Sequence, residues 1–250
     1  MLFFGKTDKG RTRASNQDAF AAVEFSSDTA FFLVCDGMGG ANGGEKASRV
    51  AIDAAVKSVS EDISAILADE SIDKCKYMPK ILTYAAEEAN LAVYDCATEE
   101  PELTGMGTTF VGAIISGDTM YVVNVGDSRL YLVTDDEVKQ ITRDHSYVQY
   151  LVDMGVMTSE QAQTSSKKNI ITKAVGTSDQ VNPDTFTVSL DGVRYVLLCS
   201  DGLTNMVSKA EMLSILSGEG ELASMAEALV ARANENGGKD NITTVLVKPN

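Results

Sequence analysis

The chain has 250 residues, and its 36 Asp and Glu residues outnumber its 21 Lys and Arg residues to give a formal net charge of −15. Such an acidic chain is a poor candidate for nucleic-acid binding, because Lys and Arg supply the affinity for phosphates in that class of protein. A chain of this length can bury a full hydrophobic core, so folding requires neither disulfides nor a structural metal.

No targeting or membrane segment is expected. The apolar runs are far shorter than the roughly 20 residues that span a bilayer, and the N-terminus lacks the apolar core of a signal peptide. The four cysteines show no C-x-x-C spacing, which favours free thiols. We therefore expect a cytoplasmic, monomeric protein without membrane insertion. Because there is a single His, oxygen atoms must hold any bound metal.

Taken in chain order, the sequence shows groups of strand-like segments separated by pairs of helix-like segments. Apolar runs rich in β-branched and aromatic residues predict strands at 30–35, 109–115, 120–125, 129–133, 185–190, 194–199 and 242–247. Apolar residues spaced three and four apart predict helices at 44–60, 79–97, 208–216 and 221–236. This grouping predicts a single α+β domain over residues 1–250, with antiparallel sheets covered by helices.

Residues 144–177 interrupt this pattern. The segment is polar, has only weak helical patterns at 147–154 and 159–164, and lies between strands. A long polar excursion of this kind is too polar for a core and is often functional. We expect it to form a lid on the surface.

Carboxylates stand at the ends of several predicted strands. Asp36 and Asp201 each follow an apolar run and precede a Gly, Asp127 follows a Gly after another run, and Asp240 precedes the last strand. A carboxylate at the rim of the core is costly to desolvate unless a cation or hydrogen bonds compensate. Such oxygen ligands suit Mg²⁺ or Mn²⁺. Asp-Gly is also the commonest hairpin signal, so one copy alone indicates only a turn.

The glycine-rich segment 37–46 (GMGGANGGEK) is not a phosphate-binding loop of a known type. Glu45 stands where the P-loop needs Lys, and Asn42 breaks the G-x-G-x-x-G dinucleotide pattern. We interpret the segment as a turn without bulky side chains that lets a large substrate approach Asp36.

The segment 8–18 adds cations and another acid just before a strand. Arg13 and Asp18 are its notable residues. An Arg beside a metal site is suited to a bidentate grip on phosphate oxygens, although most surface arginines have no such role.

Eight sequence blocks resemble, in order, those of the metal-dependent protein phosphatases, the type 2C Ser/Thr phosphatase family, and in particular its compact bacterial members. The blocks cover the whole chain and are 10–18 (GRTRASNQD), 34–45 (VCDGMGGANGGE), 105–110 (GMGTTF), 124–131 (NVGDSRLY), 142–146 (TRDHS), 169–176 (NIITKAVG), 198–204 (LCSDGLT) and 240–245 (DNITTV). The resemblance implies a four-layer α-β-β-α sandwich of two antiparallel sheets flanked by helix pairs, with residues 144–177 as an added flap subdomain.

The resemblance also implies roles for individual residues. Asp36 would bridge two Mg²⁺ or Mn²⁺ ions, the Gly37 carbonyl would complete one of them, and Asp201 and Asp240 would hold the other. A weaker third metal would lie between Asp127 and Asp201.

Three of these residues would be catalytic, namely Arg13, Asp18 and Asp36. Arg13 would bind the phosphate, and Asp18 would act through metal-bound water. Two ions that share a water would supply the hydroxide that attacks phosphorus in line, so no protein nucleophile is needed. The implied substrates are phosphoserine and phosphothreonine proteins, the targets of a cognate Ser/Thr kinase.

Two other functions stay open. A catalytically inactive relative would use the fold only for binding, although such copies usually lose an acid. A two-metal hydrolase of small phosphate esters or nucleotides would need a base-binding motif, which we do not find.

The sequence departs from the family pattern at a few positions. The loop after Asp36 lacks the His that some members carry there, and His145, at the start of the flap, has either a catalytic or a local structural role. Lys168 and Lys173 replace Arg of many bacterial relatives, and Gln17 replaces a Glu of some.

Overall fold

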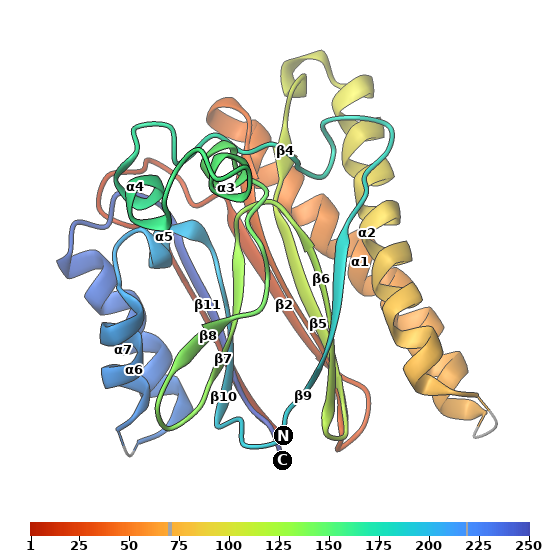
Figure 1. The fold of residues 1–250 in the computed structure, drawn as a ribbon. Helices are drawn as coiled ribbons and strands as arrows, with labels where there is room; N and C mark the ends of the chain where they lie inside the picture. Colours follow the sequence, from red (N-terminus) through yellow and green to blue (C-terminus); the bar gives the residue numbers. More distant parts are fainter. Residues whose placement is uncertain (70–71, 219) are drawn as a thin grey trace.

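Two antiparallel sheets pack face to face in the computed structural model, and helices cover the outer side of each sheet (Figure 1). The structure describes residues 1–69, 72–218 and 220–250, without the side chains of residues 41 and 42. The expected four-layer α-β-β-α sandwich is thereby confirmed. That the chain is one domain, and that it is a monomer, stay predictions.

The first sheet has the strand order β1-β11-β10-β7-β8. Its strands are β1 (Leu2–Asp8), β11 (Ile242–Lys248), β10 (Tyr195–Cys199), β7 (Arg129–Val133) and β8 (Val138–Gln140). Because β1 pairs with β11 along its whole length, the two ends of the chain lie side by side (Figure 1).

The second sheet has the strand order β2-β3-β5-β6-β9. Its strands are β2 (Asp18–Glu24), β3 (Thr29–Met38), β5 (Phe110–Ser116), β6 (Thr119–Val125) and β9 (Asp184–Ser189), and the short β4 (Gly107–Thr108) pairs with the end of β3.

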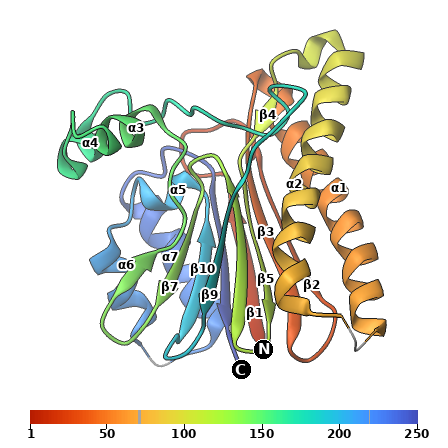
Figure 2. The ribbon, with the colours of Figure 1, turned by 45° about the vertical axis from the view of Figure 1, so that its right-hand side comes forward.

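Two helix pairs form the outer layers. The long pair packs on the second sheet and the shorter pair on the first (Figure 2). The pairs are α1 (Gly40–Ala68) with α2 (Lys74–Glu99), and α6 (Lys209–Leu216) with α7 (Leu222–Glu235). A 3₁₀ turn, η1 (Pro101–Leu103), follows α2, and α5 (Asp201–Thr204) follows β10.

The central strands β3, β5 and β10 are almost continuously apolar because both of their faces are buried. In β3, Phe31, Leu33 and Cys35 pack against α1 and α2, whereas Phe32 and Val34 point between the sheets. Successive strand residues point to opposite faces, so a strand covered on both sides needs apolar residues at every position. This is why the strand runs were recognisable in the sequence.

Several predicted bounds differ from the structure. Helix α1 begins at Gly40 and continues to Ala68 because buried Ile63 and Ile66 extend its apolar face. Helix α2 begins at Lys74, so Pro79 lies inside it and not at its start. The sequence patterns give no bounds for β1, β2, β4 or β8. Three of these are edge strands, which present one side to solvent and therefore carry a weaker apolar signal.

Segment 144–177 contains α3 (Tyr147–Asp153) and α4 (Ser159–Thr164), close to the predicted positions. Both lie beyond one end of the sheets (Figure 2). A bridge between Thr108 and Val175 ties the end of the segment to β4. None of the helices in the described ranges combines the length and hydropathy that crossing a membrane requires.

Candidate active site

Asp18 and Asp36 are direct cross-strand neighbours on β2 and β3. The prediction that Asp36 and Gly37 follow a strand is wrong: both lie within β3, which continues to Met38 because it pairs with β4. The amide of Asp36 donates a hydrogen bond of 2.9 Å to Thr109 Oγ1. The carboxylate is therefore fixed by the sheet and not by a loose turn.

Gly37 is required by its surroundings. A Cβ atom at this position would lie 2.0 Å from the carbonyl oxygen of Gly44 and 2.7 Å from that of Gln17. The N-terminal part of α1 can therefore approach β3 only because residue 37 has no side chain.

Asp201 and Asp240 lie just beyond the neighbouring ends of β10 and β11 in the other sheet. Asp201 is the first residue of α5, and Asp240 precedes β11. A Cβ atom on Gly202 would lie 1.9 Å from the carbonyl oxygen of Asn241, so only Gly allows α5 to approach the start of β11. Asn205 Nδ2 donates to Asp201 Oδ2 at 2.9 Å.

Arg13 reaches Asp240 from the loop between β1 and β2. Its Nη2 donates to Asp240 Oδ2 at 2.7 Å. Asn241 holds this loop, since its Oδ1 accepts from the amide of Gln17 and its Nδ2 donates to the carbonyl of Ser15. Sequence reasoning missed this role of Asn241, although the residue belongs to the recognised DNITTV block.

Ser200 connects the two sheets beneath the carboxylates. Its hydroxyl donates to Asp18 Oδ2 at 2.7 Å and accepts from the amide of Thr243 at 3.0 Å. The other oxygen of Asp18, Oδ1, is buried and accepts no hydrogen bond from the described residues. Sequence reasoning also missed Ser200, because a Ser before Asp-Gly carries no signal of its own.

His145 has a local structural role. Its Nδ1 accepts from the amide of Gly126 at 3.1 Å, and its Nε2 lies 3.1 Å from Asp184 Oδ2. The backbone amide of His145 also donates to the Gly126 carbonyl. The imidazole thus holds the turn that carries Asp127, and it does not line the clefts described next.

A cleft of about 690 Å³ brings most predicted residues together. We call it the catalytic cleft, after the predicted catalytic residues Arg13 and Asp36 that line it. Its wall includes Arg13, Asp36, Gly37, Asp127, Asp201 and Asp240. Asp18 does not line this cleft but lies buried opposite Asp36. Residues of the predicted flap, Ile171 to Ala174 among them, border the cleft on the remaining side.

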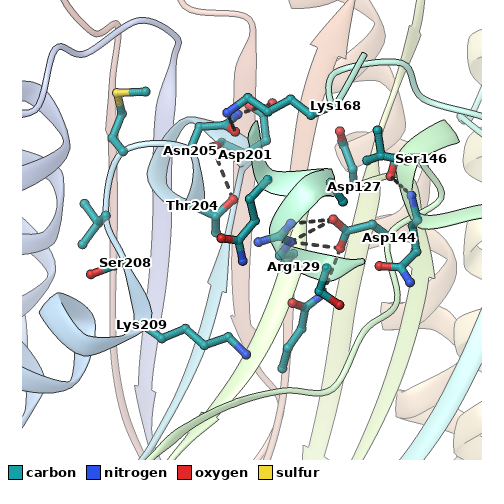
Figure 3. Close-up of a pocket in the computed structure, with 18 of the residues that line it drawn as sticks. Asp127, Arg129, Asp144, Ser146, Lys168, Asp201, Thr204, Asn205, Ser208 and Lys209 are labelled. Carbon is teal, nitrogen blue, oxygen red and sulfur yellow. Dashed lines mark hydrogen bonds and ion pairs between the residues drawn. The ribbon is translucent and has the colours of Figure 1, made fainter. Parts of the chain in front are cut away.

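A second cleft of about 790 Å³ adjoins the first. Figure 3 shows residues that line it. We call it the flap cleft, because it lies between α3 and α4 on one side and α5 and α6 on the other. The two clefts share Asp127, Asn169 and Asp201. Lys168 Nζ donates to Asn205 Oδ1 at 2.8 Å, which links the flap to the neighbour of Asp201.

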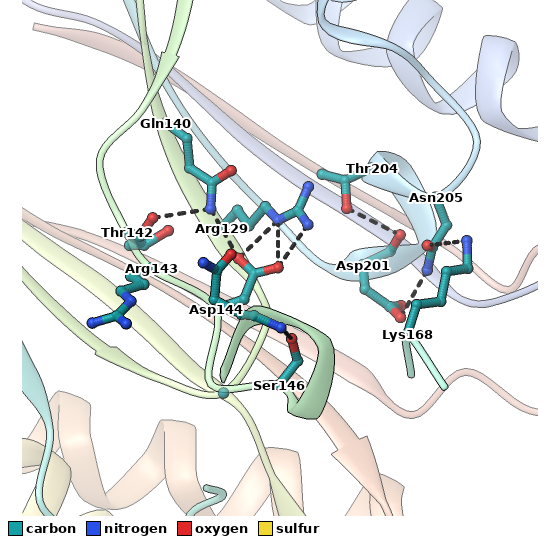
Figure 4. Close-up of polar contacts among 12 residues, drawn as sticks. Arg129, Gln140, Thr142, Arg143, Asp144, Ser146, Lys168, Asp201, Thr204 and Asn205 are labelled. Carbon is teal, nitrogen blue, oxygen red and sulfur yellow. Dashed lines mark hydrogen bonds and ion pairs between the residues drawn. The ribbon is translucent and has the colours of Figure 1, made fainter. Parts of the chain in front are cut away.

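Arg129 and Asp144, which both line the flap cleft, form a bidentate ion pair (Figure 4). Arg129 donates through Nε and Nη2 to both oxygens of Asp144, at 2.6 to 3.0 Å. Gln140 Nε2 donates to the same carboxylate at 2.8 Å. Bidentate pairs of this type fix orientation as well as charge, so this pair holds the start of the flap to β7.

The carboxylates of the site raise one another's pKa. Burial first and neighbouring carboxylates second raise the pKa of Asp18 to about 7, of Asp127 to about 8 and of Asp201 to about 6. Burial and the charge of Asp18 raise the pKa of Asp36 well above its ordinary value. A cluster with such mutual repulsion favours cations.

Residues 7–247 match the model of the family Protein phosphatase 2C. The chain belongs to this family. It is 38% identical over 245 residues to the Serine/threonine phosphatase stp of Listeria innocua, and the match covers 98% of this chain and 94% of that protein.

The fold of this chain is similar to solved structures of protein phosphatase 2C relatives along almost its full length. Serine/threonine phosphatase Stp1 from Staphylococcus aureus is 36% identical with a TM-score of 0.89, over 99% of this chain and 94% of that one. The catalytic domain of PstP, solved in complex with two manganese ions, is 33% identical with a TM-score of 0.82, over 99% and 97%.

The donor set of this protein phosphatase 2C fits divalent cations. Carboxylate oxygens surround the catalytic cleft, and one buried oxygen each of Asp18 and Asp201 has no hydrogen-bond partner in the described part of the chain. In those same residue ranges, no three His, Cys, Asp or Glu side chains are already close enough together to hold a metal ion. Binding of an ion by three such side chains would therefore require side-chain rotation.

Gln17 and Lys173, two other residues that depart from the family pattern, each contact a specific group in the structure. Gln17 Nε2 donates to the Gly40 carbonyl at 2.9 Å, which holds the start of α1. Lys173 lines the catalytic cleft and lies 3.5 Å from Asp184. Asp184 thus contacts both Lys173 and His145, a connection with no signal in the sequence.

Proposed function

We propose that this protein phosphatase 2C hydrolyses phosphoserine and phosphothreonine in proteins with the help of Mg²⁺ or Mn²⁺. The observation that carries the proposal is the arrangement of buried, mutually repelling carboxylates beside Arg13 in one cleft. The names of the relatives, and the two manganese ions of the PstP structure, support the same activity and cofactor.

Each carboxylate has a proposed role in a two-metal site. Asp36 would bind both ions, and the Gly37 carbonyl would complete the first. Asp201 and Asp240, at the neighbouring ends of β10 and β11, would hold the second. Asp18 would act through a bound water from beneath the cleft.

A weaker third ion would bind between Asp127 and Asp201, which face both clefts. Segment 144–177 would be the flap that borders the site.

The chain itself would bind and orient the phosphoryl group. When bound, the ions would supply hydroxide from water at neutral pH and balance negative charge on phosphorus. Arg13, once released from Asp240, would offer two donors to two phosphoryl oxygens. Ser200 would keep Asp18 in place, and Ile171 to Ala174 would limit the access of bulk water.

The proposed substrates are intracellular targets of a cognate Ser/Thr kinase. An inactive binding protein is disfavoured because Asp18, Asp36, Asp127, Asp201 and Asp240 are all present. A hydrolase of nucleotides would need a base-binding motif, and we find none in the sequence.

Hydrolysis assays with and without metal test this function. A phosphothreonine peptide should be hydrolysed with added Mn²⁺ or Mg²⁺, and a chelator should abolish the reaction. Asp36→Ala should lower kcat by orders of magnitude with an unchanged circular dichroism spectrum. Metal-independent turnover, or faster hydrolysis of nucleotides than of phosphopeptides, would contradict the proposal.

A further inference from the structure

The flap cleft extends from the catalytic cleft over the first sheet. Because the two clefts share Asp127, Asn169 and Asp201, a peptide with its phosphorylated residue at the carboxylates can continue into the flap cleft. The lining comes from the flap on one side and from α5 and α6 on the other. At about 790 Å³ the cleft is large enough for several side chains.

Most charged groups that line the flap cleft away from the catalytic carboxylates are already neutralised. Arg129 and Asp144 neutralise each other in the bidentate ion pair. Glu211 accepts from the amide and hydroxyl of Ser208 in a capping box and lies 3.5 Å from Arg232. These groups have little charge left to offer to a ligand.

Two cations in the flap cleft lack a carboxylate partner within the described residue ranges. Lys209 Nζ lies 5.7 Å from the centre of the Tyr131 ring, and Lys168 Nζ donates to the amide oxygen of Asn205 at 2.8 Å. Elsewhere around the flap, Arg143 pairs with Asp153 and Lys173 with Asp184. Away from the shared carboxylates Asp127 and Asp201, the cations that line the flap cleft outnumber the anions, although the whole chain carries −15.

Lys209 is well placed to meet a ligand. It is the first residue of α6, whose N-terminus is fixed by the Ser208 cap. Its side chain is exposed and extends from α6 into the cleft (Figure 3). Because a ring contact leaves the ammonium hydrogens free, Lys209 can still donate to an anion.

We propose that the flap cleft is a substrate subsite for an acidic side chain, Asp or Glu, that flanks the phosphorylated residue, and that Lys209 is its specificity-determining residue. The inference rests on the proposed function, since it concerns the peptide that the phosphatase acts on. It adds a substrate preference to that function. Although the protein has a strong overall negative charge, one local cation would make it prefer phosphorylated residues that are flanked by Asp or Glu.

The test compares two phosphothreonine peptides that differ only in their flanking residues, Asp and Glu in one and Lys in the other. The measured quantity is the ratio of their kcat/KM values, because effects on the shared catalytic step cancel in a ratio. The wild-type ratio should favour the acidic peptide and should fall when salt is added. In Lys209→Glu the ratio should fall by about three- to tenfold, the range for replacing one exposed ion pair by a repulsive pair.

Lys57→Glu is the matched control. It makes the same change of net charge at an exposed position of α1, on the opposite outer layer, and should leave the ratio unchanged. An unchanged ratio in Lys209→Glu, or an equal fall in Lys57→Glu, would overturn the subsite.

Fluorescence anisotropy with both peptides separates the subsite from the proposed activity. The acidic peptide should bind more weakly to Lys209→Glu than to the wild type, whether or not it is hydrolysed. If the wild type hydrolyses neither peptide but shows this difference in binding, the proposed function fails and the subsite stands. Equal binding of the two peptides to the wild type overturns the subsite even when both are hydrolysed.

Discussion

The side chain of Asp18 depends on a single residue from the opposite sheet. Ser200 donates to its carboxylate and accepts from the amide of Thr243, so one hydroxyl satisfies groups on β2 and β11 at once. Ser200 is 182 positions away from Asp18 in the chain. A contact of this kind follows from the packing of the two sheets, and no local pattern in the sequence could indicate it.

Ser200→Ala should destabilise the protein by about 1–3 kcal/mol, because a buried carboxylate oxygen and a buried amide would each lose a partner. Urea unfolding at neutral pH measures this change. Ser217→Ala is a suitable control, since that hydroxyl donates to the Leu213 carbonyl at the exposed end of α6. Equal free energies of unfolding for the wild type and Ser200→Ala would show that the hydroxyl does not support Asp18.

At the level of elements, predictability followed burial. Strands that are covered on both faces, such as β3 and β10, were predictable, and so were helices with a periodic apolar face. In these elements the spacing of apolar residues directly reflects which positions are buried. The sequence patterns did not give the bounds of the edge strands β1, β2 and β8, because pairing with distant parts of the chain defines these strands.

The carboxylates of the site were predictable as a set from strand ends and family blocks. Their contacts with Ser200, Asn241 and Asp184 come from tertiary structure.

The contact between α5 and the start of β11 sets the distance between two proposed metal ligands. Gly202→Ala would place a methyl group at 1.9 Å from the Asn241 carbonyl oxygen, so α5 must move and take Asp201 away from Asp240. We expect at least a tenfold loss of Mn²⁺ affinity by isothermal titration calorimetry, with a similar loss of kcat/KM.

Gly218→Ala is the control for this change. A Cβ atom there would make only an ordinary contact of 3.6 Å with the Ile215 carbonyl oxygen. Normal Mn²⁺ binding by Gly202→Ala would mean that the close approach of α5 does not position Asp201.

For the whole molecule, the carboxylates of the site couple stability to pH. The pKa of Asp18, Asp127 and Asp201 is about 7, 8 and 6 in the folded protein, against an ordinary value of 3.8. Between about pH 4 and pH 8 the folded chain therefore holds more protons than the unfolded chain at these sites, and the free energy of unfolding falls as pH rises. His145, whose pKa burial lowers, acts in the opposite direction below pH 6.5, but it is one group against several.

Divalent cations should reverse this dependence, because they replace the protons that the cluster holds at low pH. After treatment with a chelator, the protein should have a lower Tm at pH 8 than at pH 5.5, and added Mn²⁺ should raise the Tm more at pH 8. Asp36→Asn removes one repelling charge, so it should raise the Tm of the chelator-treated protein at pH 8 and reduce the shift caused by Mn²⁺.

Asp191→Asn, in the exposed turn after β9, removes the same charge far from the cluster and should change neither quantity. Differential scanning fluorimetry of the three proteins at both pH values measures all of these shifts. Equal Mn²⁺-induced shifts at pH 5.5 and pH 8 would mean that the carboxylates are already ionised without metal. Protonation of these carboxylates would then not account for the pH dependence of stability.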